Sequence, residues 1–113
     1  MRFDLPLQRD YSKIMEISFE KVNTNLTVTV KGRLDSQTSG QLESELNAQI
    51  QDVNSVIFDF KDLEYMSSAG LRIILATSKL TGKRNGLTTL KNLNSEVRNI
   101  LEVTGMINIL DVE

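Results

Sequence analysis

The sequence predicts an α/β fold in which helices pack on a mixed, mainly parallel sheet of four to five strands. Apolar and polar residues alternate near the start of the chain, which is typical of a β-hairpin. Strand-like runs then alternate with segments of helical spacing, which is typical of βαβ units with right-handed crossovers. The predicted order is ββαβαβα, with or without a last strand, and 113 residues suffice for one domain with an ordinary core.

The first predicted elements are a hairpin and a helix. Residues 16–22 and 26–31 alternate between polar and apolar side chains, and residues 23–25, Asn-Thr-Asn, form the turn between them. Asp35 or a nearby serine or threonine is expected to cap the helix that follows. One side of this helix is apolar and carries Leu42, Leu46, Ile50 and Val53.

The middle of the chain predicts a buried strand and a second helix. Residues 55–60 are β-branched and aromatic, as expected of a central strand that is covered on both faces. Residues 61–67 form a polar turn in this interpretation, and a helix with a wide apolar stripe follows. Glycine and asparagine at residues 82–86 end that helix, with Lys83 and Arg84 as cations beside the negative end of its dipole.

The last predicted elements are a short strand at residues 87–90 and a third helix. Asn94 or Ser95 caps this helix, and Gly105 ends it. Residues 106–112 are compatible with a final edge strand. The predicted inner face of the third helix carries Val97, Ile100, Leu101 and Thr104.

The domain itself is expected to span residues 15–113. Residues 1–14 contain the only proline, Pro6, and mixed charges without a clear period, which indicates an N-terminal arm or extension. No internal repeat or low-complexity tract divides the remainder of the chain.

The composition limits the classes of function. A formal net charge of −2 argues against broad nucleic-acid binding, which usually needs a basic face. The chain has neither histidine nor cysteine, and its carboxylates show no spacing of a metal site. We therefore expect a binding protein without metal or cofactor rather than an enzyme. No apolar run resembles a signal or a membrane span, so a cytoplasmic protein that makes no membrane contact is the default expectation.

Two serines at the start of the second helix are the candidate functional site. A serine at a helix start points its hydroxyl at free backbone N–H groups, and the positive end of the helix dipole favours an anion. Ser67 and Ser68 are therefore either plain caps or a site that accepts a phosphate. Because the carboxyl ends of parallel strands meet at one edge of a sheet, Asp35 and Ser68 are expected to be neighbours.

Two motifs give the chain a family resemblance. Residues 65–71, Tyr-Met-Ser-Ser-Ala-Gly-Leu, follow a strand that ends in Asp59 and resemble the phosphorylation loop of bacterial anti-sigma factor antagonists, the family of STAS domains. Residues 32–35, Gly-Arg-Leu-Asp, resemble the Gly-x-Leu/Ile-Asp turn that these domains place before their first helix. The two motifs and the elements between them cover roughly residues 15–113. The resemblance thus implies a STAS-like fold.

The resemblance also assigns roles to individual residues. Family members typically read Asp-Ser in this loop and phosphorylate the serine, so Ser67 aligns with the aspartate and Ser68 with the acceptor. Ser67 is the alternative acceptor. Arg72 stands where a small residue is common, and a cation one turn into the helix can pair with a phosphate on Ser68. The residues expected to contact a partner are Gly32, Asp35, Met66, Ser67, Ala69, Gly70, Leu71 and Arg72.

Four of these contact residues have a second interpretation. Met66 and Leu71 form either a partly exposed apolar patch or part of the core. Gly70 costs about 1 kcal/mol in a helix relative to alanine, a cost that the close approach of a partner can offset. Gly32 serves either a positive φ or a tight approach of the backbone.

In function, the resemblance implies a switched binding protein. Its dephosphorylated form binds an anti-sigma factor that is also a serine kinase, and so promotes release of a sigma factor. Phosphorylation by that kinase ends the interaction, and a serine phosphatase restores it. One alternative is a STAS subunit of a larger assembly, such as a lipid transporter, that has no phosphate switch. Another is a small-molecule or nucleotide sensor that binds at the same edge.

Overall fold

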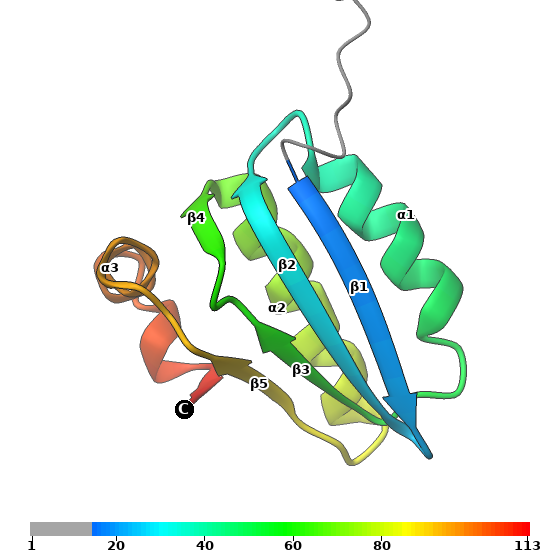
Figure 1. Cartoon of the computed structure of the whole chain (residues 1–113). Helices are drawn as coiled ribbons and strands as arrows, with labels where there is room; N and C mark the ends of the chain where they lie inside the picture. Colours follow the sequence, from blue (N-terminus) through cyan, green and yellow to red (C-terminus); the bar gives the residue numbers. More distant parts are fainter. Residues whose placement is uncertain (1–14) are drawn as a thin grey trace, which may run out of the picture.

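A computed structural model describes residues 15–113, so the expected N-terminal arm at residues 1–14 lies outside the described residues. Within residues 15–113, six strands form one sheet in the order β1-β2-β3-β5-β6, and β4 pairs with β2 beyond β3 (Figure 1). The pair β1–β2 is antiparallel, and the other pairs are parallel. The strands are β1 (Met15–Val22), β2 (Asn25–Leu34), β3 (Ser55–Asp59), β4 (Leu63–Met66), β5 (Thr88–Lys91) and β6 (Asp111–Val112).

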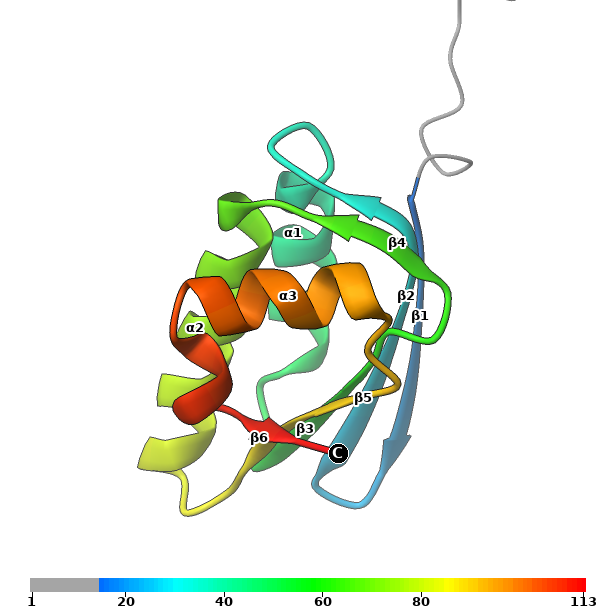
Figure 2. The same cartoon turned by 90° about the vertical axis from the view of Figure 1, so that its left-hand side faces the viewer.

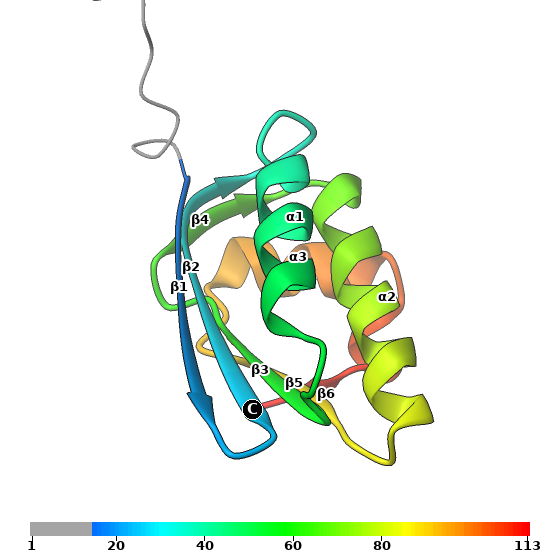
Figure 3. The same cartoon turned by 90° about the vertical axis from the view of Figure 1, so that its right-hand side faces the viewer.

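The helices of the described chain all lie on one side of the sheet. Figure 2 and Figure 3 show α1 and α2 side by side on one face, with α3 on the same side. A short 3-10 helix, η2, leads from α3 to β6. The helices are α1 (Ser39–Gln49), α2 (Ser68–Lys83), α3 (Ser95–Val103) and η2 (Met106–Asn108). The α/β class, the mixed and mainly parallel sheet and the predicted order of elements are confirmed, with one strand, β4, more than the five expected at most. Residues 106–112, expected as a final edge strand, form η2 and only a two-residue strand, β6.

The core fills the space between the helices and the sheet. Along β2, Leu26, Val28 and Val30 are fully buried, while Thr27 and Thr29 between them are only half-buried. This alternation places one side of each strand under the helices. The largest fully buried side chains on and beside the central strand are Phe58 and Phe60, whose rings stack with centroids 5.7 Å apart. Burial of apolar surface on this one face therefore holds the helices in place.

The face of the sheet away from the helices corrects one prediction. Residues 55–60 were expected to form a strand covered on both faces, but within residues 15–113 no helix covers the second face (Figure 3). Val56 and Phe58 point to the helices and are fully buried, whereas Ile57 is only half-buried. The apolar run therefore reflects a β-branched central strand with one open side.

The polar turn predicted at residues 61–67 is wrong over most of its length. Leu63–Met66 forms β4, which pairs in parallel with the end of β2, so that Arg33 lies opposite Tyr65 and Leu34 opposite Met66. The prediction also treated residues 32–34 as part of a turn, but they are the last residues of β2. Both errors have one cause, because two short and partly charged segments become strands by pairing with each other.

Arg84 links the C-terminal ends of α1 and α2. This residue is the C-cap of α2, and its Nη1 donates to the carbonyl oxygens of Ile50 at 2.7 Å and Val53 at 2.6 Å. The first helix was expected to carry Ile50 and Val53, but α1 ends at Gln49, and these two buried residues follow it. Arg84 thus satisfies carbonyl groups at the end of α1 in addition to lying near the negative end of α2.

Most of the predicted turns and caps are confirmed. Asn23 turns the hairpin with φ 57°, and Gly105 follows α3 with φ 78°. Asn94 caps α3, since its Oδ1 accepts from the backbone N–H of Val97 at 2.8 Å. The same side chain donates from Nδ2 to the carbonyl oxygen of Leu63 at 2.7 Å, and this bond ties α3 to β4.

Candidate functional site

The turn between β2 and α1 is closed by Asp35 and Thr38. Oδ1 of Asp35 accepts from the backbone N–H groups of Gln37 at 2.9 Å and Thr38 at 3.2 Å. Thr38 is buried, and its hydroxyl donates to the carbonyl oxygen of Arg33 at 2.8 Å and accepts from the N–H of Asp35 at 2.9 Å. Thr38 is the N-cap residue of α1 but makes no side-chain cap bond to the helix. Asp35 and Thr38, the candidate caps of α1, therefore use their side chains to stabilise the turn between β2 and α1.

The environment of Asp35 favours its charged form. Burial raises the pKa of this carboxyl, but the N–H groups of Gln37 and Thr38, the Thr38 hydroxyl and the Arg33 guanidinium outweigh burial and lower it below the ordinary value of 3.8. Oδ2 of Asp35 lies 3.6 Å from Nε of Arg33. Asp35 is thus an anion at neutral pH, and both of its oxygens have neighbours within the chain.

The turn after β4 lies directly beside the turn after β2. The backbone N–H of Ser67 donates to the carbonyl oxygen of Leu34 at 2.9 Å, which extends the ladder between the two strands by one bond. Asp35 and Ser68 each follow the residues joined by this bond. The predicted meeting of the two turns at one edge of the sheet is therefore confirmed, and Figure 1 shows β2, β4 and the start of α2 converging there.

The two serines of the motif have different environments. Ser67 is the N-cap of α2, and its Oγ accepts from the N–H of Ala69 at 3.2 Å. Ser68 is the first residue of α2 and is exposed, and within residues 15–113 its hydroxyl makes no hydrogen bond. The first turn of α2 carries no acidic residue. The capping role thus belongs to Ser67, which leaves the Ser68 hydroxyl accessible beside the positive end of the helix.

The apolar residues that flank the serines are core residues in this structure. Met66 is 1% exposed and Leu71 is 8% exposed, so the interpretation of a partly exposed patch is wrong and the alternative holds. Gly70 is also buried. A Cβ atom on Gly70 would lie 2.7 Å from Cγ of Leu34, so the glycine is explained by packing inside the chain and no partner is needed to explain it.

Gly32 has a positive φ of 98°, the first of the two roles expected for it from the sequence. The register between β2 and β4 shifts between Gly32 and Arg33, and the N–H of Gly32 donates to the carbonyl oxygen of Asp62 at 3.0 Å. Such a shift bends the strand and leaves one residue unpaired. The unpaired residue is Glu64 of β4, and Gly32 lies opposite Leu63 directly before the shift, which brings Arg33 opposite Tyr65.

Asp59 at the end of β3 has a structural environment. Its Oδ1 accepts from Nδ2 of Asn92 at 2.9 Å and from the N–H of Lys61 at 3.0 Å. The Asn92 amide is the main cause that lowers the pKa of Asp59, and the N–H of Lys61 acts in the same direction against the effect of burial. Asp59 thus joins the ends of β3 and β5.

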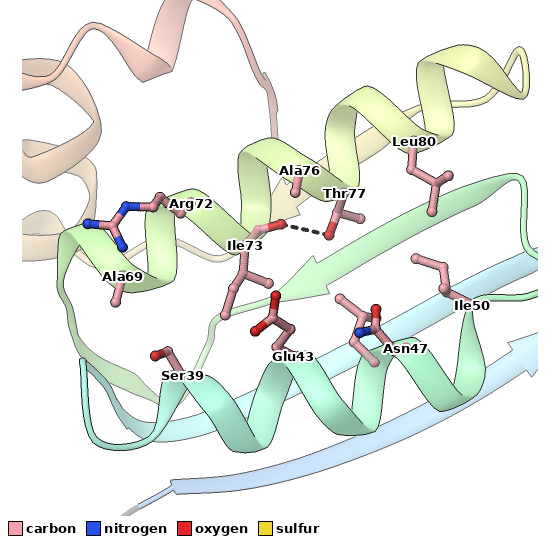
Figure 4. A pocket seen from close by; sticks show the side chains of 11 residues that line it. Ser39, Glu43, Asn47, Ile50, Ala69, Arg72, Ile73, Ala76, Thr77 and Leu80 are labelled. Carbon is pink, nitrogen blue, oxygen red and sulfur yellow. Dashed lines mark hydrogen bonds between the residues drawn. The ribbon is translucent and has the colours of Figure 1, made fainter.

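Arg72 is exposed and follows Ser68 by one helical turn. Residues four apart on a helix are surface neighbours, so the Arg72 side chain can reach a group attached to Ser68. Arg72 also lines a groove of about 430 Å3 between α1 and α2. Figure 4 shows Ala69 and Arg72 at the end of this groove near the start of α2, with Ile50 and Leu80 at the other end.

Sequence reasoning missed Arg33 and Tyr65. The Arg33 guanidinium lies over the Tyr65 ring, with Cζ 4.4 Å from the ring centroid, while Nε faces Asp35. These two residues lie opposite each other in the β2–β4 register. The only signal in the sequence is indirect, because Arg33 and Tyr65 belong to the two recognised motifs and become neighbours once both segments are assigned as paired strands.

The described residues contain no metal site or membrane span. Within residues 15–113, no group of three or more aspartate or glutamate side chains is placed to hold a metal ion. None of the helices in this part of the chain is long and apolar enough to cross a membrane. The polar groups that the site presents are the Ser68 hydroxyl, the N-terminus of α2 and the side chains of Arg33 and Arg72.

Comparison with known proteins identifies the family. The STAS domain family model matches residues 16–113, so the chain belongs to the STAS domain family. BtrV of Bordetella bronchiseptica, a candidate anti-sigma factor antagonist, is 33% identical over 99 residues, which cover 87% of this chain and 85% of that protein. The anti-sigma F factor antagonist of Paenibacillus polymyxa is 27% identical over 100 residues, 87% of this chain and 86% of its own.

A solved structure supports the fold independently. The Bacillus cell fate determinant SpoIIAA in its phosphorylated form matches with a TM-score of 0.68 and 20% identity, over 86% of this chain and 90% of that chain. This likeness concerns the arrangement of strands and helices. The STAS-like fold implied by the two sequence motifs is therefore confirmed both by the family match and by the structure.

Proposed function

We propose that the chain is an anti-sigma factor antagonist that is switched by phosphorylation of Ser68. In its dephosphorylated form it binds an anti-sigma factor serine kinase and so promotes release of a sigma factor. Phosphorylation by that kinase ends the interaction, and a serine phosphatase restores it. In this proposal the chain is a cytoplasmic binding protein and not an enzyme, and residues 15–113 are the functional domain.

The observation that carries the proposal is the division of roles between the two serines. Ser67 caps α2 with its own side chain, so the helix start does not depend on Ser68. Ser68 is exposed at the first position of α2, where a phosphate is favoured by the helix dipole. The names of the two relatives, both antagonists of anti-sigma factors, support the same function.

Incubation with ATP and the partner kinase should place phosphate on Ser68. The physical reason is access, because Ser68 is exposed whereas Ser67 is half-buried and holds the cap. Mass spectrometry of proteolytic fragments locates the phosphate, and Ser68→Ala is the control that should abolish labelling. Phosphate found only on Ser67 would shift the acceptor by one residue, and an unlabelled chain that still binds the kinase would remove the switch.

Arg72 should slow the removal of the phosphate from Ser68. Its guanidinium can form charge-assisted hydrogen bonds to a phosphate one turn away, which stabilises the modified state. Arg72→Ala should therefore speed dephosphorylation of Ser68 by the partner phosphatase, while the unmodified variant binds the kinase nearly as the wild-type chain does. Lys79→Ala, which removes an exposed cation from the same helix two turns further on, is the control. Equal dephosphorylation rates for wild type and Arg72→Ala would exclude this role.

The groove between α1 and α2 favours a small-molecule sensor as the second candidate function. Its volume of about 430 Å3 lies within the range of ligand pockets, and apolar and polar side chains line it together. A ligand that binds the folded chain raises its melting temperature, and the rise grows with the logarithm of ligand concentration once the ligand is in excess over its dissociation constant. A nucleotide or metabolite that produces this shift, in a chain that incorporates no phosphate, would replace the switch as the better proposal.

A further inference from the structure

Arg33 has an exposed guanidinium that its neighbours hold in place. Its side chain is 50% exposed, yet Nε lies 3.6 Å from Oδ2 of Asp35 and Cζ lies 4.4 Å from the centroid of the Tyr65 ring. Asp35 is itself fixed, since its Oδ1 accepts from two backbone N–H groups of the turn. A free arginine loses much rotamer entropy on binding, and an arginine that is already ordered loses less.

The contacts of Arg33 leave its terminal amino groups available. Within residues 15–113, neither Nη atom donates a hydrogen bond, and the contact with Asp35 is made through Nε. Leu34, the next residue, is fully buried under the helices, so Arg33 lies on the opposite side of β2. The two Nη groups of a guanidinium match the two oxygens of a carboxylate, which makes paired hydrogen bonds its preferred contact.

Arg33 and its guanidinium lie close to the phosphorylation site proposed at Ser68. Arg33 is paired with Tyr65 on β4, two residues before Ser67 and three before Ser68. The Ser67 N–H donates to the carbonyl oxygen of Leu34, the residue after Arg33, so the Arg33–Tyr65 pair lies at the same edge of the sheet as the start of α2, within reach of a partner that covers Ser68. Arginine and tyrosine are enriched among residues that dominate binding energy at protein interfaces. Asp35, in contrast, has both carboxylate oxygens engaged within the chain.

We propose that Arg33 binds an aspartate or glutamate carboxylate of the partner kinase, and that Asp35 and Tyr65 are positioning residues that hold Arg33 for this contact. This inference rests on the proposed function and adds the chemistry of the partner surface. In this inference, Asp35 contributes to partner binding through its effect on the position of Arg33. The other group that the Nη groups of Arg33 could bind is the phosphate on Ser68. The two alternatives can be told apart, because a partner carboxylate affects binding by the unmodified chain, whereas the phosphate is present only in the phosphorylated chain.

The experiment measures the affinity of the unmodified chain for the anti-sigma factor kinase recovered with it from native lysate. We expect Arg33→Ala to weaken binding about tenfold or more, and Arg33→Lys to recover part of the loss, because lysine keeps the charge but not the fork. Lys31→Ala is the matched control, since it removes an exposed cation from the same strand, and it should change affinity less than about twofold. Melting temperatures verify that each variant is folded.

A double-mutant cycle tests the positioning role of Asp35. Asp35→Asn keeps an oxygen that accepts the hydrogen bonds of the turn but removes the charge that faces Arg33. It should weaken kinase binding in the wild-type background and have little further effect in the Arg33→Ala background, because the two residues then act as one unit. A merely structural role of Asp35 would give the same loss in both backgrounds and would overturn that part of the proposal.

The remaining outcomes separate this inference from the proposed function. Unchanged kinase binding by Arg33→Ala overturns the inference alone, provided that the wild-type chain binds. If Arg33→Ala instead alters only dephosphorylation of phosphorylated Ser68, the fork serves the phosphate and the inference is wrong. Equal losses for Arg33→Ala and Lys31→Ala would indicate general attraction between charges, which also overturns it. A wild-type chain that fails to bind any anti-sigma factor kinase refutes the proposed function, and this inference with it.

Discussion

Replacing Gly70 by alanine should lower the free energy of unfolding by up to about 2 kcal/mol, although alanine is the better helix former. A Cβ atom at this position would lie 2.7 Å from Cγ and 2.8 Å from Cδ2 of Leu34, and 3.0 Å from Cγ of Met66. Leu34 and Met66 are almost completely buried, so neither side chain can move aside at low cost. The overpacking cost of about 1–3 kcal/mol therefore exceeds the gain of about 1 kcal/mol in helix propensity.

The matched control is the other glycine of the same helix. A Cβ atom on Gly82 would meet no atom within 4 Å, and Gly82 is exposed, so Gly82→Ala should leave stability unchanged or raise it by up to about 1 kcal/mol. Urea unfolding of both variants and the wild-type chain measures the difference. If both substitutions stabilise the chain equally, the close packing of Gly70 against β2 and β4 does not hold in solution.

Gly70→Ala should also weaken partner binding. Leu34 and Met66 directly precede Asp35 and Ser67, so a shift of either side chain displaces the two turns of the site. Gly70 thus contributes to the site through packing and not through a contact of its own. This explains why a position that looks functional in sequence is buried in the structure.

The parts of the fold that sequence predicts are those fixed by local patterns. The hairpin, the three helices and the Asn94 cap follow from alternation, helical spacing and capping residues, and all are confirmed. β4 could not be predicted in this way, since Leu63–Met66 has four residues, one of them charged, and becomes a strand only because the end of β2 lies beside it. Pairing between distant segments decides this strand, and local propensity does not.

The candidate site shows the same limit. Two helix-starting serines and a neighbouring aspartate were predictable from the motifs, and their turns do meet. Which serine caps α2 depends on the backbone at the end of β4, so the sequence left Ser67 and Ser68 open as caps and the structure selects Ser67. The Arg33–Tyr65 contact depends on the register of two strands, which a single sequence does not specify.

Substituting Ser68 by aspartate should abolish most kinase binding and leave the fold intact. An acidic residue in the first turn of α2, which has none, interacts favourably with the helix dipole by about 0.3–1 kcal/mol, so the melting temperature should stay close to that of the wild-type chain. A partner surface that packs over an uncharged hydroxyl would have to desolvate the carboxylate, which costs several kcal/mol unless a cation meets it. Since about 1.4 kcal/mol is tenfold in affinity, the loss should reach at least about tenfold even for this weak mimic of phosphate.

Ser95→Asp is the control that shows whether a loss of binding comes from a charge at the site itself or from an added negative charge at any helix start. Ser95 is the exposed first residue of α3, so the substitution adds the same charge at the same helical position away from the site, and it should change neither stability nor kinase binding appreciably. Ser68→Ala should bind the kinase and escape phosphorylation. Calorimetric titration against the kinase and thermal unfolding of the four proteins give both quantities. Binding by Ser68→Asp at wild-type affinity, or a loss that follows from unfolding alone, would contradict a switch that acts by charge at the surface of the folded domain.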